Sequence, residues 1–297
     1  MRWLFNRSGT PRIEQAQWIA DDAWARLLDR HRFLHRLDTV ERARLRNLCA
    51  TFLASKAING AAGFALTDGM VASIAVQACL PVLELGIEAY PAFVEIIVYP
   101  SDFIVDREIV DENGVVHAWT GAIAGESWEG GPIVLAWNAI SDECAGERGG
   151  SAHRPTPFAF NVVIHEFAHK LDMNNGAVDG MPVFSRALHS TLHSTLREAH
   201  WQAVLQASLE DFAARVDAAE ASIPSHVDPE SARADRYFAA LPFDAYAATD
   251  EGEFFSVTSE AFFVTPERLV AAYPEWYALL AAYYRQDPLN QRPAIPA

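Results

Sequence analysis

Three short runs of β-branched and aromatic residues lie between two long stretches of helical pattern, and this order limits the fold more than any other feature. The runs cover residues 94–99, 114–119 and 132–137, and clusters of Asp, Asn and Gly separate them. We expect them to form a small, mainly antiparallel sheet. The order of helices, sheet and helices then predicts one α+β unit.

The helices before the sheet have recognisable ends. Apolar residues recur at helical spacing from residue 13 to residue 59, which predicts a helical hairpin whose second helix is capped by Thr39 and ended by Gly60. A third helix is expected to begin at Thr67 or Asp68, because either side chain can accept from free backbone N–H groups. It should continue to about residue 79.

The chain after the sheet is expected to be helical almost to its end. A loop rich in Gly and Pro at 145–157 comes first, and an irregular segment at 222–235 interrupts the helices. The sequence has no repeat and no linker long enough to require separate domains. We therefore expect residues 1–297 to form a single unit, with an N-terminal helical region of about 13–80 packed on a region of about 90–285.

Composition and charge restrict the partners. The 297 residues include 39 Asp and Glu against 23 Lys and Arg, which gives a formal net charge of -16. Binding to nucleic-acid phosphates requires clustered Lys and Arg, so a protein or peptide is the expected partner and direct nucleic-acid binding is not. The most apolar segment, 71–87, is interrupted by Gln77, Pro81 and Glu84, so no membrane span is expected. Three scattered cysteines and a very short apolar run at the N-terminus predict a cytoplasmic protein.

One short motif carries the chemistry. In VIHEFAHKLD, His165 and His169 are four residues apart and Glu166 follows the first. On a helix both imidazoles leave the same face one turn apart and reach a single tetrahedral ion, while Glu166 lies beside them. In hydrolases with this motif the glutamate takes a proton from the attacking water and hands it to the leaving amine. We expect one catalytic Zn²⁺ per chain here.

The alternative is a chance pattern on a solvated helix. Its setting argues otherwise, because Thr156 and Pro157 predict a helix start, Gly176 predicts its end, and the motif lies between them among apolar residues. Two buried histidines without ligation or partners would be costly. The sequence therefore favours a zinc site.

The third protein ligand has several candidates. Asp172 is one turn beyond His169 and would either bind zinc or accept a hydrogen bond from a ligand imidazole. In the apolar segment 250–263, Glu253, Ser256 and Glu260 fall on one helical stripe. Acidic residues on an otherwise apolar helix are expected to have a binding partner, which here could be the metal. The alternative for Glu253 is a capping box with Asp250.

Longer segments carry a family resemblance. ACLPVLELG, VYPSDF, GPIVLAW, FNVVIHEFAHKLDM, DAYAATDEGEFFSVTSEAFF and RQDPL resemble the Mlc titration factor A family of bacterial zinc peptidases, from about residue 18 to residue 289. The family's catalytic core is similar to that of the anthrax lethal factor protease, a gluzincin. The resemblance implies a mostly helical, zincin-like metallopeptidase fold.

The resemblance also implies roles for single residues. His165, His169 and Glu253 would be the zinc ligands and Glu166 the general base. Tyr246 would donate to the oxyanion of the reaction, and the alternative is a packed tyrosine with a local hydrogen bond. Gluzincins carry an acid four residues after the glutamate ligand, but Val257 stands there, so Glu260 or Asp172 would orient a ligand instead.

Two functions follow from these expectations. The first is a zinc peptidase with aminopeptidase-like activity on short peptides, in which the strand GPIVLAW offers a free edge to an extended substrate because Pro132 cannot donate to a neighbouring strand. The second is a binding protein that titrates the glucose-responsive transcriptional repressor Mlc, with a structural or regulatory zinc. The segment 222–235 lies between the two metal-bearing helices and is either a lid or a surface loop.

Overall fold

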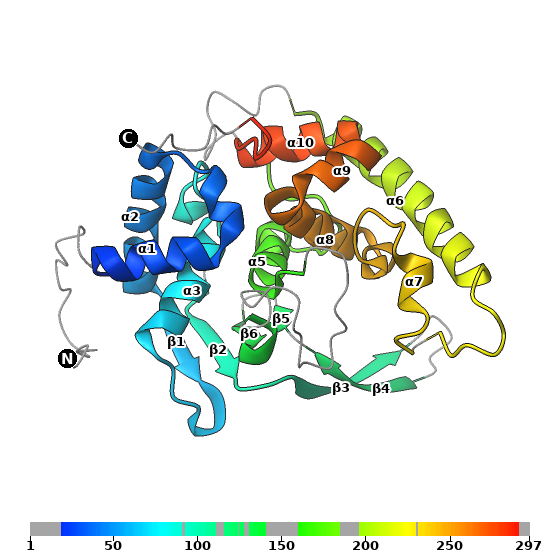
Figure 1. Cartoon of the computed structure of the whole chain (residues 1–297), viewed down its shortest axis with the longest axis horizontal. Helices are drawn as coiled ribbons and strands as arrows, with labels where there is room; N and C mark the ends of the chain where they lie inside the picture. The colour runs from blue at the N-terminus through cyan, green and yellow to red at the C-terminus, as the bar shows by residue number, and fades with distance from the viewer. Residues whose placement is uncertain are drawn as a thin grey trace.

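A computed structural model describes residues 19–90, 93–110, 116–123, 125–127, 131–140, 160–184, 196–229 and 231–290. Figure 1 shows α1, α2 and α3 at one side of the molecule and α6 and α7 at the other, with α5 and α8 between them. A single hydrophobic cluster includes residues of the N-terminal helices, the sheet and the C-terminal helices. The α+β fold class is confirmed. The single-unit organisation, with residues 13–80 packed on 90–285, stays a prediction.

The N-terminal helices occur in the predicted order, but the second helix of the expected hairpin ends at Ser55, so its predicted end at Gly60 was wrong. They are α1 (Asp21–Arg30), η1 (Arg32–Arg36), α2 (Thr39–Ser55), η2 (Ala61–Gly63) and α3 (Asp68–Cys79). Asp38, one residue before the expected cap, forms a capping box with Glu41 at the start of α2. Thr67 caps α3 through the N–H of Met70, as predicted.

The strands form a mixed sheet, and the expected mainly antiparallel arrangement was wrong. β1 (Ala57–Gly60), β2 (Glu95–Tyr99), β6 (Ile133–Ala136) and β5 (Gly125–Ser127) lie side by side in the order β1-β2-β6-β5. The two pairs that β2 makes are parallel, and only β5 runs antiparallel to its neighbour. One of these parallel pairs involves β1, a strand that was missed because residues 13–59 were interpreted as helical, whereas the other joins two strands that were predicted. The crossover through α3 brings β1 and β2 together in the same direction.

β6 is not an edge strand. It is paired with β2 on one side and with β5 on the other, so the predicted substrate edge at GPIVLAW was wrong. Pro132 precedes the first paired residue, where its missing N–H costs no ladder hydrogen bond. Within the described part of the chain, β5 is the strand at that end of the sheet. A separate antiparallel hairpin joins β3 (Phe103–Val110) to β4 (Val116–Ile123).

Helices make up most of the remaining described chain. They are η3 (Ile87–Ala89), α5 (Val162–Asp172), η4 (Met173–Asn175), α6 (Glu198–Ala221), α7 (Asp235–Phe238), η6 (Ala245–Ala248), α8 (Glu251–Val264), α9 (Pro266–Ala272) and α10 (Pro274–Tyr284). The irregular segment before α7 is as predicted over its described residues. No helix among the described residues is both long and apolar enough to cross a bilayer.

α5, the motif helix, begins later than expected. Its cap is Asn161, whose side chain accepts from the N–H of Ile164, so the predicted start at Thr156 was wrong. Thr156 and Pro157, and the predicted loop at 145–157, lie outside the described residues. The predicted end is confirmed, because η4 continues the helix to Gly176, which takes a left-handed conformation with φ 91°.

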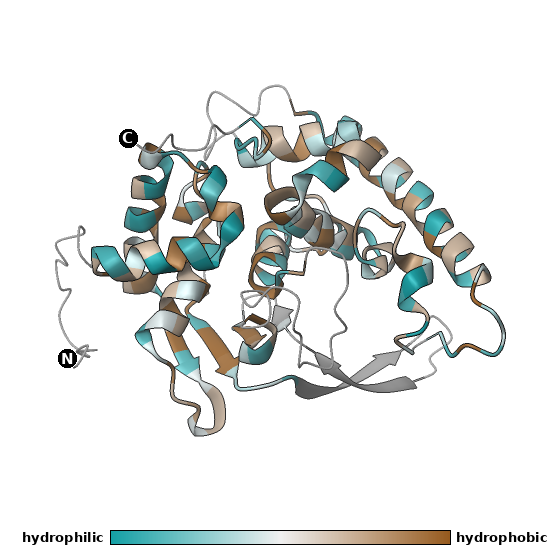
Figure 2. Ribbon diagram, viewed as in Figure 1, coloured by the Kyte–Doolittle hydropathy of each residue, from teal (hydrophilic) through white to brown (hydrophobic). Residues whose placement is uncertain are grey.

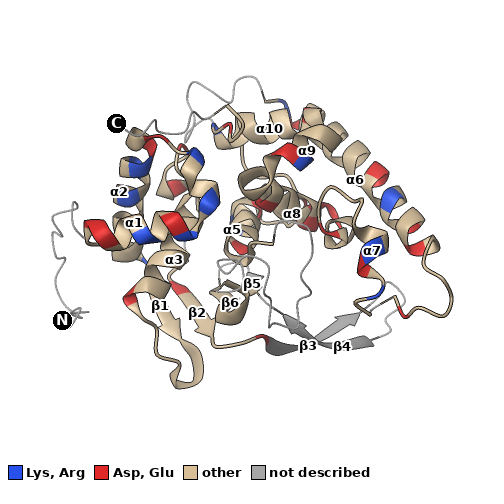
Figure 3. Cartoon of the chain, in the orientation of Figure 1, with Lys and Arg blue, Asp and Glu red and all other residues tan. Residues whose placement is uncertain are grey.

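The packing of α5 and α8 positions the motif. α5 packs against β5 and β6 on one side and against α8 on another, and nearly every residue of both helices is buried. Figure 2 shows α8 mostly in the brown of apolar residues, and Figure 3 shows acidic positions on this same helix at the centre of the molecule. Buried carboxylates on an apolar helix require partners, because an unpaired buried charge is very costly. α5 supplies those partners.

Candidate metal centre

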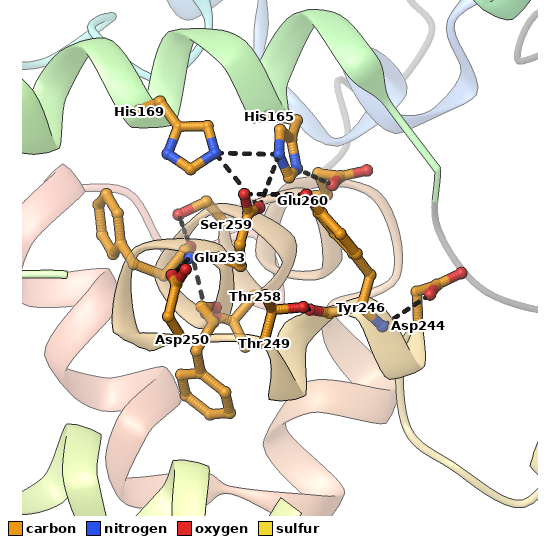
Figure 4. Close-up of polar contacts among 12 residues, drawn as sticks. His165, His169, Asp244, Tyr246, Thr249, Asp250, Glu253, Thr258, Ser259 and Glu260 are labelled. Atoms are coloured by element: carbon orange, nitrogen blue, oxygen red, sulfur yellow. Dashed lines mark hydrogen bonds and ion pairs between the residues drawn. The ribbon is translucent and has the colours of Figure 1, made fainter. Parts of the chain in front are cut away.

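His165, His169 and Glu253 converge between α5 and α8 (Figure 4). The Nε2 atoms of the two histidines are 3.1 Å apart, and Glu253 Oε2 lies 3.1 Å from His165 Nε2 and 3.3 Å from His169 Nε2. Tetrahedral ligands at the usual zinc bond lengths lie about 3.3 Å from one another. The three atoms therefore fit three corners of a zinc site. They are the two histidines and the glutamate that were expected to act as ligands.

The cap of α8 explains only half of the role of Glu253. Asp250 Oδ1 accepts from the backbone N–H of Glu253 at 2.8 Å, as the capping alternative required. The Glu253 side chain, however, points to the two histidines, and it is only 17% exposed. The cap thus fixes the first turn of α8 and leaves the carboxylate available for a metal.

Glu260, and not Asp172, contacts a ligand histidine. Glu260 Oε1 lies 2.7 Å from His165 Nδ1, and its Oε2 accepts from the backbone N–H of Asn161 at 2.5 Å. A carboxylate that accepts from Nδ1–H leaves the lone pair of Nε2 free for a metal. Asp172 is fully buried, and its Oδ2 accepts from the N–H of Gly180 at 2.8 Å. The geometry therefore favours Glu260 for the orienting role that the sequence left open.

The electrostatics of the cluster follow from these contacts. Burial opposes charge on His165, but hydrogen bonds to Glu253 and Glu260 outweigh it and raise the pKa of His165 well above its ordinary value. Burial also opposes charge on Glu253, yet both histidines hold its pKa far below the usual range. Burial raises the pKa of Glu260 and raises that of Asp172 to about 7. The site thus strongly favours an ionised Glu253, the state that binds a cation.

Glu166 lies on the sheet side of α5, directly against β5. A Cβ placed on Gly125 would be 2.5 Å from Glu166 Oε1, so the strand leaves no room for a side chain at that position. The carboxylate of Glu166, only 4% exposed, is therefore next to both the ligand histidines of its helix and the backbone of β5. Gly125 could not be predicted as part of the site, because a single glycine in a short strand has no specific pattern.

Lys170 is a second residue that sequence reasoning missed. It is 1% exposed, and its Nζ donates to the carbonyl of Gly131 at 3.1 Å. Burial lowers the pKa of Lys170 to about 8, and the nearby Glu166 opposes that shift. A buried ammonium one turn beyond Glu166 favours the ionised form of that carboxylate. The sequence feature that could have identified Lys170 is a lysine inside an otherwise apolar helix.

Tyr246 reaches the cluster from η6. Its hydroxyl donates to Glu253 Oε1 at 3.1 Å, and its ring centroid is 6.2 Å from that of His165. The residue is 52% exposed and therefore only partly packed, while its hydroxyl does form a hydrogen bond within the chain, so the oxyanion role stays a prediction. Asp244 holds the turn by accepting from the backbone N–H of Tyr246. A half-exposed phenol beside the metal ligands is suited to donate a hydrogen bond to a bound substrate.

Comparison with known proteins agrees with this geometry. Residues 4–285 match the family described as glucose-regulated metallo-peptidase M90. Proteins named Mlc titration factor A are 36% identical to the chain: the Escherichia fergusonii protein over 97% of this chain and 93% of its own length, the Salmonella gallinarum protein over 96% and 91%, and the Klebsiella pneumoniae protein over 93% and 92%. The family match covers nearly the whole chain, including every residue of the cluster. The chain therefore belongs to the glucose-regulated metallo-peptidase M90 family.

Proposed function

We propose that this protein is a zinc-dependent peptidase with aminopeptidase-like activity on short peptides. The observation that carries the proposal is the spacing of three ligand atoms, from His165, His169 and Glu253, at the edges of a zinc tetrahedron, with Glu166 beside them. Two imidazoles and one carboxylate form the ligand set of catalytic rather than structural zinc. Zinc bound there would polarise the scissile carbonyl and lower the pKa of the attacking water.

Three side chains of the protein would have separate roles in the reaction. Glu166 takes a proton from the water as the water oxygen bonds to the carbonyl carbon, and it returns that proton to the amine as the C–N bond breaks. Lys170, one turn away, would place a positive charge near the carboxylate of Glu166. The hydroxyl of Tyr246 donates to the oxyanion that develops from the carbonyl oxygen.

The substrate would bind along β5 instead of β6. β5 pairs with β6 on one side and packs beside α5 at Glu166, so an extended peptide added to its other side would lie next to the metal ligands. Gly125 allows this close approach between strand and helix. The setting would be the cytoplasm, with the segment at 222–235 as a candidate lid.

The test is hydrolysis of a mixed fluorogenic peptide library by the zinc-loaded wild type and by Glu166→Gln, with bound zinc quantified in both. We expect hydrolysis by the wild type only, with about one zinc in each protein, because Glu166 is not a ligand. Glu220→Gln, at an exposed position near the end of α6, is the matched control and should cut as the wild type does. Full hydrolysis by Glu166→Gln would refute the mechanism.

A second candidate function rests on the names of the relatives. Proteins 36% identical to this chain are called Mlc titration factor A, which indicates that they titrate Mlc. We propose binding of an Mlc-type repressor as an additional or alternative role, with the metal site structural or regulatory. A pull-down of purified repressor that survives Glu166→Gln supports the binding role, whereas the absence of a stable complex with either protein refutes it.

A further inference from the structure

Buried polar side chains connect the metal cluster to the N-terminal helices. The connection starts at Glu260, which contacts His165 Nδ1 with one oxygen and accepts from the backbone N–H of Asn161 with the other. Asn161 Nδ2 in turn donates to Gln77 Oε1 at 2.6 Å. Glu260, Asn161 and Gln77 are 3%, 2% and 0% exposed. Three successive contacts thus lead from a ligand ring to the last turn of α3.

The orientation of each amide in this connection is determined by its partners. Asn161 Oδ1 accepts from the N–H of Ile164, so its NH₂ group must face Gln77. Gln77 Nε2 donates to the carbonyl of Ser73 at 3.0 Å, so its oxygen must face Asn161. Neither amide can turn over without leaving buried donors opposed to each other, which is costly. The network has one arrangement.

The far end of the connection is also buried. Ser73 Oγ lies 2.9 Å from His31 Nε2, and both residues are at most 2% exposed. Burial lowers the pKa of His31 to about 4, so the ring is neutral at ordinary pH. The connection therefore joins α8, the start of α5, α3 and the residue that follows α1 through side chains that are all buried.

We propose that Gln77 and Asn161 are positioning residues for the metal centre. Gln77 holds Asn161, Asn161 directs its N–H at Glu260, and Glu260 holds the ring of His165 with Nε2 toward the cluster. The N-terminal helices thereby take part in metal binding and do not only cover the core. This inference rests on the proposed metal site and extends it to residues far from the motif in the sequence.

A purely structural role for Gln77 makes a different prediction. A buried glutamine that only fills space would affect the stability of the fold and leave the metal affinity unchanged. Gln286 offers the comparison, because it is 4% exposed and, within the described part of the chain, its amide donates to the carbonyls of Leu80 and Pro81 and not to the cluster. Replacing Gln77 or Gln286 by Met keeps the length of the side chain and removes the amide in each case.

The test measures the zinc Kd of the full-length protein by competition with a chromophoric chelator. Partners that orient ligand residues typically contribute 10- to 100-fold in metal affinity, so we expect Gln77→Met to weaken zinc binding by about tenfold. Gln286→Met should keep the wild-type Kd while its melting temperature falls. An unchanged Kd in Gln77→Met, or an equal loss in Gln286→Met, would overturn the proposal.

A double variant tests the route of the effect. If Gln77 acts through Glu260, the change Gln77→Met should cause no further loss of affinity in a Glu260→Gln background. Additive losses would refute that route. Should Gln77→Met fail to fold, Asn161→Ser retains an oxygen for the N–H of Ile164 and removes the contact with Gln77, and the same tenfold loss is expected.

The outcome is separate from that of the peptidase proposal. Wild type that binds zinc but hydrolyses no peptide would contradict the proposed activity and leave the positioning result intact. Hydrolysis by the wild type together with an unchanged zinc Kd in Gln77→Met would support the peptidase activity and contradict the positioning role of Gln77. Wild type that does not bind zinc would overturn both.

Discussion

Gly125→Ala tests the placement of Glu166 without altering any ionisable group. The added Cβ would be 2.5 Å from Glu166 Oε1, 2.8 Å from Glu166 Cγ and 2.7 Å from Val162 Cγ2. Favourable contacts between carbon atoms begin near 3.5 Å, so the strand and the glutamate must separate by roughly 0.7 to 1 Å. A displacement of about 1 Å in a catalytic group costs on the order of 100-fold in rate, or about 2.7 kcal/mol of transition-state stabilisation.

The assay is kcat/KM on the best peptide from the fluorogenic library, together with the zinc Kd. We expect a loss of about 100-fold in kcat/KM and an unchanged zinc Kd, because Glu166 is not one of the ligands. Gly69→Ala is the control, since the nearest atom to an added Cβ there, within the described chain, is Thr67 Oγ1 at 3.9 Å. Wild-type kcat/KM in Gly125→Ala would show that Glu166 does not need its observed position beside β5.

Two further substitutions separate catalysis from stability. Tyr246→Phe removes the hydroxyl beside Glu253, and we expect kcat to fall by about 100-fold with little change in melting temperature, because the ring is half exposed; an unchanged kcat would exclude an oxyanion role. Burial lowers the pKa of His31 to about 4, whereas an exposed histidine has a pKa of 6.5. Between these two pH values the unfolded chain binds a proton at His31 and the folded chain does not, so the free energy of unfolding falls as the pH drops from 6.5 to about 4. Between about pH 7 and pH 5 this costs about 2 kcal/mol, which His31→Gln should remove in urea unfolding; equal pH dependence of the two proteins would refute the assignment.

Local patterns predicted the helices better than the sheet. Thr67 and Gly176 mark helix ends because a capping hydroxyl and a left-handed glycine act on neighbouring backbone groups. The strand β1 was missed because its short sequence, AING, continues the apolar pattern of the preceding helix. Its identity as a strand comes from pairing with β2 far along the chain. The free edge likewise lies at β5 and not at β6 because β5, another short strand that was not predicted, pairs with β6.

The candidate site shows the same division. His165 and His169 could be placed together from their spacing, because an α-helix fixes the relation between residues four apart. Glu253 could be predicted as a ligand only from the polar stripe on its helix together with the family resemblance, because no local sequence pattern shows that α8 packs against α5. Gly125 and Gln77 were not recognised as parts of the site. Their roles depend on which segment packs against which, and neither residue belongs to a motif.

Asp172 and Glu260 illustrate why the nearer candidate is not always the one that contacts a ligand. Asp172 follows His169 by one helical turn, yet its carboxylate accepts from the N–H of Gly180 in the loop after α5. That loop packs on the start of α8, where a Cβ on Gly180 would be 2.6 Å from the carbonyl of Glu251 and one on Gly252 would collide with Val178. Asp172 therefore supports the turn of α8 that carries Glu253, whereas Glu260 contacts His165 directly. The two buried acids thus support different ligands of the candidate site: Asp172 acts on Glu253 through a loop, and Glu260 acts on His165 by a direct hydrogen bond.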